Sequence, residues 1–457
     1  MRALEIAARV RAGETSAEQV AAQALEAVAR RNPELNCFTA TTAQRALAQA
    51  RELDLRRRRG ETLPALAGVP FAAKDLFDIQ GLPTLAGSGL HREAPPASVD
   101  AVLVSRLTAS GALLIGALNM DAYAYGFTTE NSAFGPARNP HDTARTCGGS
   151  SGGCGGAVAG GLVPLALGSD TNGSIRVPAS LCGVFGLKPT YGRLPRTGAY
   201  PFVDSLDHVG PFAADSADLA ACYDALQGWD ASDPVCANRA SDPVLPKIGR
   251  DARLRVARLT GYFDRFAGEA ARTASLHAAQ SLGARDEIEL PEVERARAAA
   301  FVLTAAEGGA RHLPTLRTHY DGFEPLNRDR LLAGALTPAS WYLKAQRLRA
   351  WFRDKARELF QRFDLLVAPA TPVSATPLGE EWLEVNGERL PLRANMGLLT
   401  QPISFIGLPV AAVPVPVAST LPIGVQLIAP PWREDLCLLA AAMLERAGVA
   451  RATIAHD

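Results

Sequence analysis

A glycine-rich segment between residues 146 and 180 carries hydroxyl groups that are suited to nucleophilic chemistry. It reads TCGGSSGGCGGAVAGGLVPLALGSDTNGSIRVPAS and contains Ser150, Ser151 and Ser174. A serine hydroxyl is a weak nucleophile until a nearby base takes its proton. Lys74 ends the apolar run LAGVPFAAK, where burial would lower its pKa because burial disfavours the charged form. Lys74 is therefore a candidate base for one of these serines.

The scarcity of lysine adds weight to this candidate. Only five of the 47 basic residues are lysine, at positions 74, 188, 247, 344 and 355. A position that keeps lysine can need a cation that is able to lose its proton, and arginine does not lose its proton in proteins. For Lys74, an ion pair with Asp75 or Asp170 is the structural alternative. Lys188, which precedes a proline, is expected to hold loop carbonyls.

The stretch SDTNGSIR predicts an oxyanion site. Its turn can direct several backbone N–H groups toward one point and stabilise a developing negative charge. The candidate donors are the backbone amides of Thr171, Asn172, Gly173 and Ser174. Asp170 and Arg176 flank the turn and are expected to pair and hold it in place.

Other chemistries fit the sequence less well. A phosphate-binding loop needs a lysine directly after the glycines, and none follows here. A Ser-His-Asp hydrolase is disfavoured because adjacent side chains on a strand point to opposite faces, so Asp207 cannot orient His208. The histidines have no metal-ligand spacing. We expect neither a metal nor a cofactor.

Composition narrows the class of protein. Lys+Arg and Asp+Glu both total 47 in 457 residues, so no basic surface for direct nucleic-acid binding is expected. No apolar run is long enough for a membrane span, and the first residues do not resemble a signal peptide. Seven cysteines without a CxxC pair argue against a disulfide framework and a structural zinc site. These features predict a cytoplasmic protein without a membrane partner.

The elements that would position these residues alternate between helices and strands. A helix is expected from a capping box of Thr15 and Glu18 to Pro33, and another over the alanine-rich residues 267 to 300. SVDAVLVSRLTASGALLIGALNM reads as helix, glycine turn and buried strand, which is a crossover unit. DLLVAPATP, GLPVAAVPVPV and PIGVQLIAPP read as strands.

These elements predict an α/β fold: a single large domain over residues 1–457, with a mixed twisted central sheet covered by helices on both faces. Within it we distinguish four segments by their residues. They are an N-terminal helical segment (about 1–60), a catalytic core (about 61–215), a variable substrate-side segment (about 230–360) and C-terminal strands with a helix (about 361–457).

Three motifs in the same order resemble the amidase signature family. They are GVPFAAKDLFD, CGGSSGG and GSDTNGSIRVPAS. The resemblance implies a Ser-cis-Ser-Lys triad with Lys74 as the base and Ser174 as the acylated nucleophile. Ser150 would relay the proton, held by a cis peptide bond after Gly149. Ser151 would have a supporting role.

Further motifs resemble the branch of the glutaminyl-tRNA amidotransferase A subunit. Within this branch they are most similar to the hydrolases that act on 1-carboxybiuret in cyanuric acid breakdown. These motifs include GLKPTYGR, GLLTQP and PIGVQLIAPPW. The resemblance implies an amidohydrolase that releases ammonia from a small urea-like or carboxylated amide. It also implies a homo- or hetero-oligomer with a small partner related to the amidotransferase C subunit. Two alternatives are the ammonia-supplying subunit of a tRNA-dependent amidotransferase and a non-catalytic scaffold.

The substrate pocket is expected to include Arg330, which lies roughly where the amidotransferase subunit recognises a carboxylate. Tyr125, Thr128 and Gln401 are further pocket candidates. Two positions depart from the family: Asn172 stands where glycine is usual, and Cys147 where proline is usual. Asparagine tolerates left-handed backbone better than most residues, so the oxyanion turn is compatible with Asn172.

Overall fold

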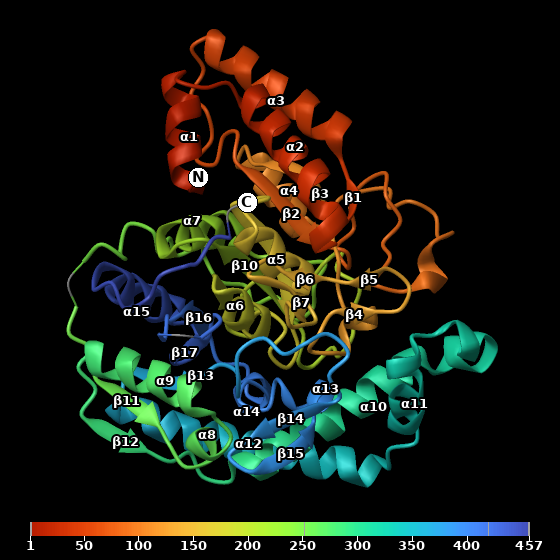
Figure 1. Cartoon of the computed structure of the whole chain (residues 1–457), viewed down its shortest axis with the longest axis vertical. Coiled ribbons are helices and arrows are strands. Elements are labelled where there is room, and N and C mark those ends of the chain that lie inside the picture. The colour runs from red at the N-terminus through yellow and green to blue at the C-terminus, as the bar shows by residue number, and fades with distance from the viewer. Residues whose placement is uncertain (1, 251, 419, 456–457) are drawn as a thin grey trace.

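The computed structural model describes residues 2–250, 252–418 and 420–455 and centres on one large sheet. Figure 1 shows the N-terminal helices α1 to α3 at one end of the molecule. Strands β12 and β15 lie towards the other end, where α10 and α11 project to one side. The segments of the glycine-rich region occupy the middle.

The sheet has eleven strands in the order β1-β3-β2-β8-β10-β9-β16-β17-β13-β11-β12. In that order the strands are Phe38–Thr41, Leu113–Leu118, Pro70–Lys74, Leu165–Asp170, His208–Ala213, Phe185–Lys188, Val410–Pro414, Gly424–Ile428, Leu365–Pro369, Val256–Leu259 and Asp286–Ile288. Three short two-stranded sheets are β4 with β5 (Glu130–Asn131, Gly135–Pro136), β6 with β7 (Arg138–Asn139, Asp142–Thr146) and β14 with β15 (Trp382–Val385, Glu388–Pro391).

The pairing is mixed, as the sequence predicts. β3, β2 and β8 run parallel to one another, as do β13, β11 and β12. The strands between β8 and β13 pair antiparallel. Because parallel strands end at the same edge of a sheet, the segments that follow β3, β2 and β8 meet there.

The helices surround this sheet. They are α1 Ala3–Ala12, α2 Ala17–Leu35, α3 Ala43–Arg58, α4 Val102–Ala109, α5 Gly152–Ala159, α6 Arg176–Cys182, α7 Ser216–Leu226, α8 Tyr262–Arg265, α9 Glu269–Ser281, α10 Val293–His319, α11 Pro325–Ala335, α12 Ala339–Arg362, α13 Leu392–Asn395, α14 Gln401–Phe405 and α15 Glu434–Arg446. None of the helices in the described ranges is both long and apolar enough to cross a lipid bilayer.

Alternate residues of the central strands pack into two different apolar clusters, so both faces of the sheet are covered. In β8, Leu165 and Leu167 join the cluster that includes residues of α4, α7 and α15. Ala166 between them joins the cluster that includes residues of α2 and α5. Successive strand side chains point to opposite faces, which explains this division.

Two expected helix boundaries are wrong. The capping box at the start of α2 lies one residue later than expected, at Ser16 and Gln19. The helix also continues past Pro33 to Leu35, because the stop comes from Asn36 in the left-handed conformation.

The helix expected over residues 267 to 300 is interrupted. α9 ends at Ser281, and Gly283 follows in the left-handed conformation with φ of 76°. The chain then forms β12, which adds a parallel edge strand beside β11, and α10 begins only at Val293. A left-handed glycine ends a helix at no steric cost, and alanine-rich composition alone does not reveal the break.

Candidate active site

Lys74 lies at the carboxyl end of β2 and is fully buried. Its Nζ lies 2.7 Å from Ser150 Oγ and 2.9 Å from Ser169 Oγ. Burial lowers its pKa to about 8. Within the described residues no carboxylate forms an ion pair with Lys74, so the alternative of a pair with Asp75 or Asp170 is wrong.

The two neighbouring serines face different partners. The peptide bond between Gly149 and Ser150 is cis. The Ser150 carbonyl accepts a hydrogen bond from the Asp121 amide at 3.2 Å, while its hydroxyl contacts Lys74. Ser151 Oγ instead donates to the Ser169 carbonyl at 3.1 Å. Ser151 therefore ties the loop to β8 and does not contact the lysine.

Helix α5 begins directly after these serines, and its glycines allow it to approach the strands closely. A Cβ at Gly153 would lie 2.5 Å from the Asn119 carbonyl oxygen and 2.7 Å from that of Cys37. Any side chain there would push α5 away from the segment after β3. Part of the glycine-rich composition therefore serves close backbone packing, which places the Ser150 loop beside Lys74.

The turn after β8 has the features of an oxyanion site. Among the described residues, the backbone amides of 171 to 174 donate to no protein acceptor. Gly173 has φ of +143°, and its ideal Cβ would lie 2.1 Å from Thr400 Oγ1. Thr400 Oγ1 donates to the Asn172 carbonyl at 2.7 Å and so holds the turn. Ser174, which is 2% exposed, ends the turn.

Asp170 and Arg176 form the pair that the sequence predicts. Both side chains are fully buried, and the guanidinium binds the carboxylate through Nε and Nη2, each at 2.9 Å. The Arg176 guanidinium holds the pKa of Asp170 well below its usual range. Asp170 Oδ2 also accepts from the Ile175 amide at 3.2 Å. The pair therefore braces both ends of the turn that contains Ser174.

Asp207 and His208 do not form a catalytic dyad, as their neighbouring positions on a strand predict. Asp207 accepts from Thr171 Oγ1 at 2.7 Å and from the Phe202 amide at 2.8 Å. His208 Nδ1 instead contacts the Leu206 and Asp170 carbonyls. Asp207 thus joins the oxyanion turn to the loop that carries Phe202.

A pocket opens above Ser174 and holds three of the four expected substrate contacts. It is lined by Ala124, Tyr125, Gly126, Phe127, Thr171, Asn172, Ser174, Phe202, Phe301, Thr304, Arg330, Arg393, Ala394 and Gln401. The Arg330 guanidinium carbon lies 4.0 Å from the centre of the Tyr125 ring. Gln401 accepts from Arg297 Nε at 2.9 Å. Thr128 does not line the pocket, but its hydroxyl accepts from Arg393 Nη1 at 3.0 Å.

Several residues at the site were not predicted from the sequence, and Ser169 and Arg393 are the two with polar contacts there. Ser169 contacts Lys74, and Arg393 lines the pocket while pairing with the buried Asp121 at 3.1 Å. Ser169 sits one residue before Asp170 at the end of β8, so the parallel pairing of β2 and β8 could have suggested it. Arg393 is one arginine among many in the sequence, and nothing in its sequence context marks it.

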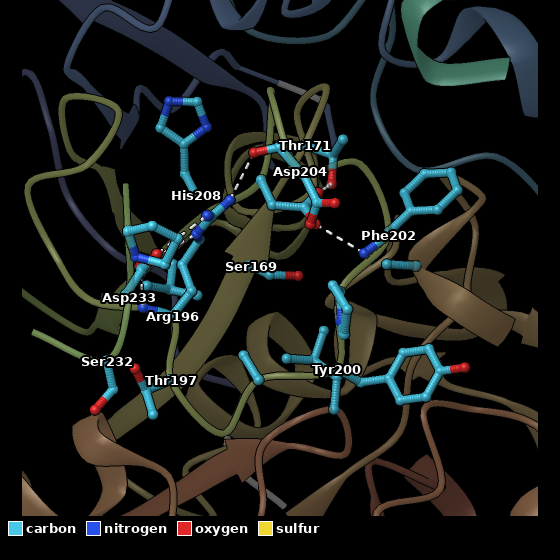
Figure 2. Close-up of a pocket in the computed structure, with 17 residues that line it drawn as sticks. Ser169, Thr171, Arg196, Thr197, Tyr200, Phe202, Asp204, His208, Ser232 and Asp233 are labelled. Carbon is cyan, nitrogen blue, oxygen red and sulfur yellow. Dashed lines mark hydrogen bonds and ion pairs between the residues drawn. The ribbon is translucent and has the colours of Figure 1, made fainter. Parts of the chain in front are cut away.

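A second cavity of about 180 Å³ adjoins the first and shares Ala124, Thr171 and Phe202 with it. Figure 2 shows Ser169 at its centre, with an Arg196–Asp233 ion pair along one wall. Ser169 lines this cavity and contacts Lys74, which is itself fully buried and does not line it. No group of three or more metal-ligating side chains occurs in the described part of the chain.

Lys188 has the structural role that the sequence predicts. It is fully buried at the end of β9, and its Nζ donates to the carbonyls of Pro189 and Leu408. It makes no contact with the serines described above. Of the two lysines that are buried in the described part of the chain, Lys74 contacts serine hydroxyls there and Lys188 does not.

Comparison with known proteins agrees with this geometry. The model of the amidase family matches residues 19–438. The chain is 55% identical to AtzE, the 1-carboxybiuret hydrolase subunit of Pseudomonas sp. (strain ADP), over 99% of both chains. It is 36% identical to the A subunit of the glutamyl-tRNA(Gln) amidotransferase of Moorella thermoacetica, over 95% of this chain and 93% of the other.

Solved structures give the same result. One, described as a vestigial protein complex that reveals the evolutionary origins of an s-triazine catabolic enzyme, superposes with a TM-score of 0.98 at 55% identity, over 99% of this chain and 100% of the other. A bacterial aryl acylamidase of the amidase signature family superposes with a TM-score of 0.90 at 27% identity, over 98% of this chain and 96% of the other. The chain is an enzyme rather than a scaffold, and it belongs to the amidase signature family.

Proposed function

We propose that this amidase hydrolyses the terminal amide of a small carboxylated ureide, 1-carboxybiuret, and releases ammonia. The observation that carries the proposal is the buried Lys74 amine in contact with the Ser150 hydroxyl, next to the turn that ends at Ser174. The 55% identity to a 1-carboxybiuret hydrolase subunit supports the choice of substrate.

The first step forms an acyl-enzyme. Uncharged Lys74 accepts the Ser150 proton, Ser150 accepts the Ser174 proton, and Ser174 Oγ bonds to the amide carbon. The former carbonyl oxygen becomes an oxyanion, which the free amides of residues 171 to 174 stabilise. The Ser174 hydroxyl has no hydrogen-bond partner within the described ranges, so its hydrogen bond to Ser150, which the relay requires, has to form when the substrate binds.

The second step releases the products. The C–N bond breaks as the relayed proton reaches the leaving nitrogen, and ammonia departs. Water then adds to the acyl carbon and gives a proton to Ser150, which passes its own proton to Lys74. As the bond between the acyl carbon and Ser174 Oγ breaks, a proton returns from Lys74 through Ser150 to Ser174 Oγ, and the acid product leaves.

Arg330 is the residue that we assign to the substrate carboxylate. No carboxylate of the described chain pairs with it, and its guanidinium lies 4.0 Å from the Tyr125 ring centre and 5.6 Å from that of Phe301. A planar guanidinium that is held on aromatic rings is well placed for two parallel hydrogen bonds to a carboxylate. Gln401, in the same pocket, contributes a polar wall.

The test measures ammonia release by the purified chain from 1-carboxybiuret, biuret and glutamine. We expect 1-carboxybiuret to have the highest kcat/KM. Arg330→Met should lower the ratio of kcat/KM for 1-carboxybiuret over biuret by at least about tenfold, because only the first carries a carboxylate. A fluorophosphonate should label Ser174 and fail to label Ser174→Ala. Labelling of Ser151, or equal loss for both substrates in Arg330→Met, would contradict the assignments.

A second candidate is the ammonia-supplying subunit of a tRNA-dependent amidotransferase. The 36% identity to amidotransferase A subunits over nearly the whole chain favours it. Such a subunit hydrolyses glutamine, so a kcat/KM for glutamine above that for 1-carboxybiuret would replace the first proposal by this one.

We also propose that the chain works with a small partner related to the amidotransferase C subunit. The support is that one relative is named as part of a multi-subunit hydrolase and one similar structure is described as a complex. Large apolar side chains are exposed just after α11 and on α12: Leu336 at 76%, Trp341 at 58% and Leu343 at 57%. The molar mass of the co-expressed pair in solution tests this proposal, since a chain that elutes alone contradicts it.

A further inference from the structure

Two residues that line the Ser174 pocket each carry a buried polar atom without a hydrogen-bond partner among the described residues. These atoms are Asn172 Oδ1, which is an acceptor, and Arg393 Nε, which is a donor. A buried polar atom without a partner is costly, so most such atoms in folded proteins are satisfied. Two of opposite kind on residues that line one pocket indicate that a ligand supplies the missing groups.

The orientation of the Asn172 amide follows from its neighbour Thr304. Asn172 Nδ2 donates to Thr304 Oγ1 at 2.9 Å. Thr304 Oγ1 in turn donates its own proton to the Ala300 carbonyl at 2.8 Å. Because the hydroxyl proton is already used, Thr304 can only accept from Asn172. A flipped amide would set two oxygens against each other, so Oδ1 is the free atom.

The backbone of Asn172 is also held. Its carbonyl accepts from Thr400 Oγ1, and the residue is 6% exposed. It lies two residues before Ser174 and lines the same pocket as Thr304. The free acceptor therefore belongs to a side chain that is held in place in the pocket that Ser174 lines.

We propose that Asn172 Oδ1 accepts a hydrogen bond from a substrate N–H next to the scissile carbonyl, and so selects ureides over ordinary amides. The inference rests on the proposed function and adds a specificity-determining side chain to it. Arg393 Nε donates to a second substrate carbonyl. A ureide presents an N–H between two carbonyls, whereas an ordinary amide has carbon at that place.

The test compares biuret with malonamide, which differ only by an N–H or a CH2 between two carbamoyl groups. For each variant we divide kcat/KM for biuret by kcat/KM for malonamide. We compare this ratio with the same ratio in the unmodified full chain, so that the intrinsic reactivities of the two compounds cancel. If either compound is not turned over, the ratio of the two compounds' constants for inhibiting 1-carboxybiuret hydrolysis is used instead. The variants are Asn172→Gly, Thr304→Val and Thr304→Ser.

We expect Asn172→Gly to lower the ratio by at least about tenfold, which corresponds to one buried hydrogen bond. Thr304→Val should also lower it, because the amide loses the oxygen that orients it. Thr304→Ser keeps this hydroxyl and should keep the ratio. Unchanged ratios in Asn172→Gly and Thr304→Val would overturn the inference while leaving the proposed function in place. Turnover of glutamine alone by the unmodified chain would overturn both.

Discussion

The pH dependence of catalysis should follow the ionisation of Lys74. Its amine must be uncharged to accept a proton, and burial lowers its pKa to about 8. The uncharged fraction is then about 1% at pH 6, about 50% at pH 8 and about 99% at pH 10. The proposed base is therefore active above pH 8, and activity is lost as the pH falls through this value.

The expected profile differs from that of an ordinary lysine. With a pKa of about 8, kcat/KM rises about fiftyfold from pH 6 to 8 and only about twofold from pH 8 to 10. An unperturbed lysine would give a rise of about 75-fold in the second interval. The discriminating measurement is therefore the plateau above pH 9.

The assay is the initial rate of ammonia release from an amide that does not titrate between pH 6 and 10. Lys74→Met removes the base and nearly keeps the volume, and should lower kcat by about a hundred- to ten-thousandfold. Lys355→Met is the control, because Lys355 pairs with Glu358 on α12, away from the site. A rate that keeps rising tenfold per pH unit above pH 9 would refute the reasoning. So would a Lys74→Met variant with more than a tenth of the activity.

Two further predictions concern the turn that holds Ser174. Arg176→Met leaves the buried Asp170 carboxylate without its partner and should lower the free energy of unfolding, measured in urea, by about 3–5 kcal/mol. The control is Arg51→Met, which removes an exposed ion pair with Glu18 and should lower it by about 0–1 kcal/mol. Equal losses in the two variants would contradict a bracing role for the buried pair. Gly173→Ala places a Cβ against Thr400 at a φ of +143° and should lower kcat at least about a hundredfold. Gly379→Ala, at φ of +78° in open space, should leave kcat unchanged, and a similar loss in both would refute the role of the turn.

Much of this fold could be predicted from local pattern. The apolar run before Lys74 forms β2, and the helix and strand that follow form α4 and β3, because apolar periodicity and glycine turns act over a few residues. The helix boundaries at Ser16 and Gly283 were predicted wrongly. Each depends on which of several similar residues adopts the capping or left-handed conformation, and composition does not identify that residue.

By itself the sequence determined the types of residue at the site: a lysine at a strand end, serines in a glycine-rich loop, and a turn rich in backbone amides. Only the tertiary structure decided their partners. Ser169 contacts Lys74 across 95 positions and Arg393 contacts Thr128 across 265. The reason is physical. The parallel strands β2 and β8 bring Lys74 and Ser169 to one edge of the sheet, and α13 places Arg393 beside the segment that follows β3, so these contacts depend on topology rather than on local pattern.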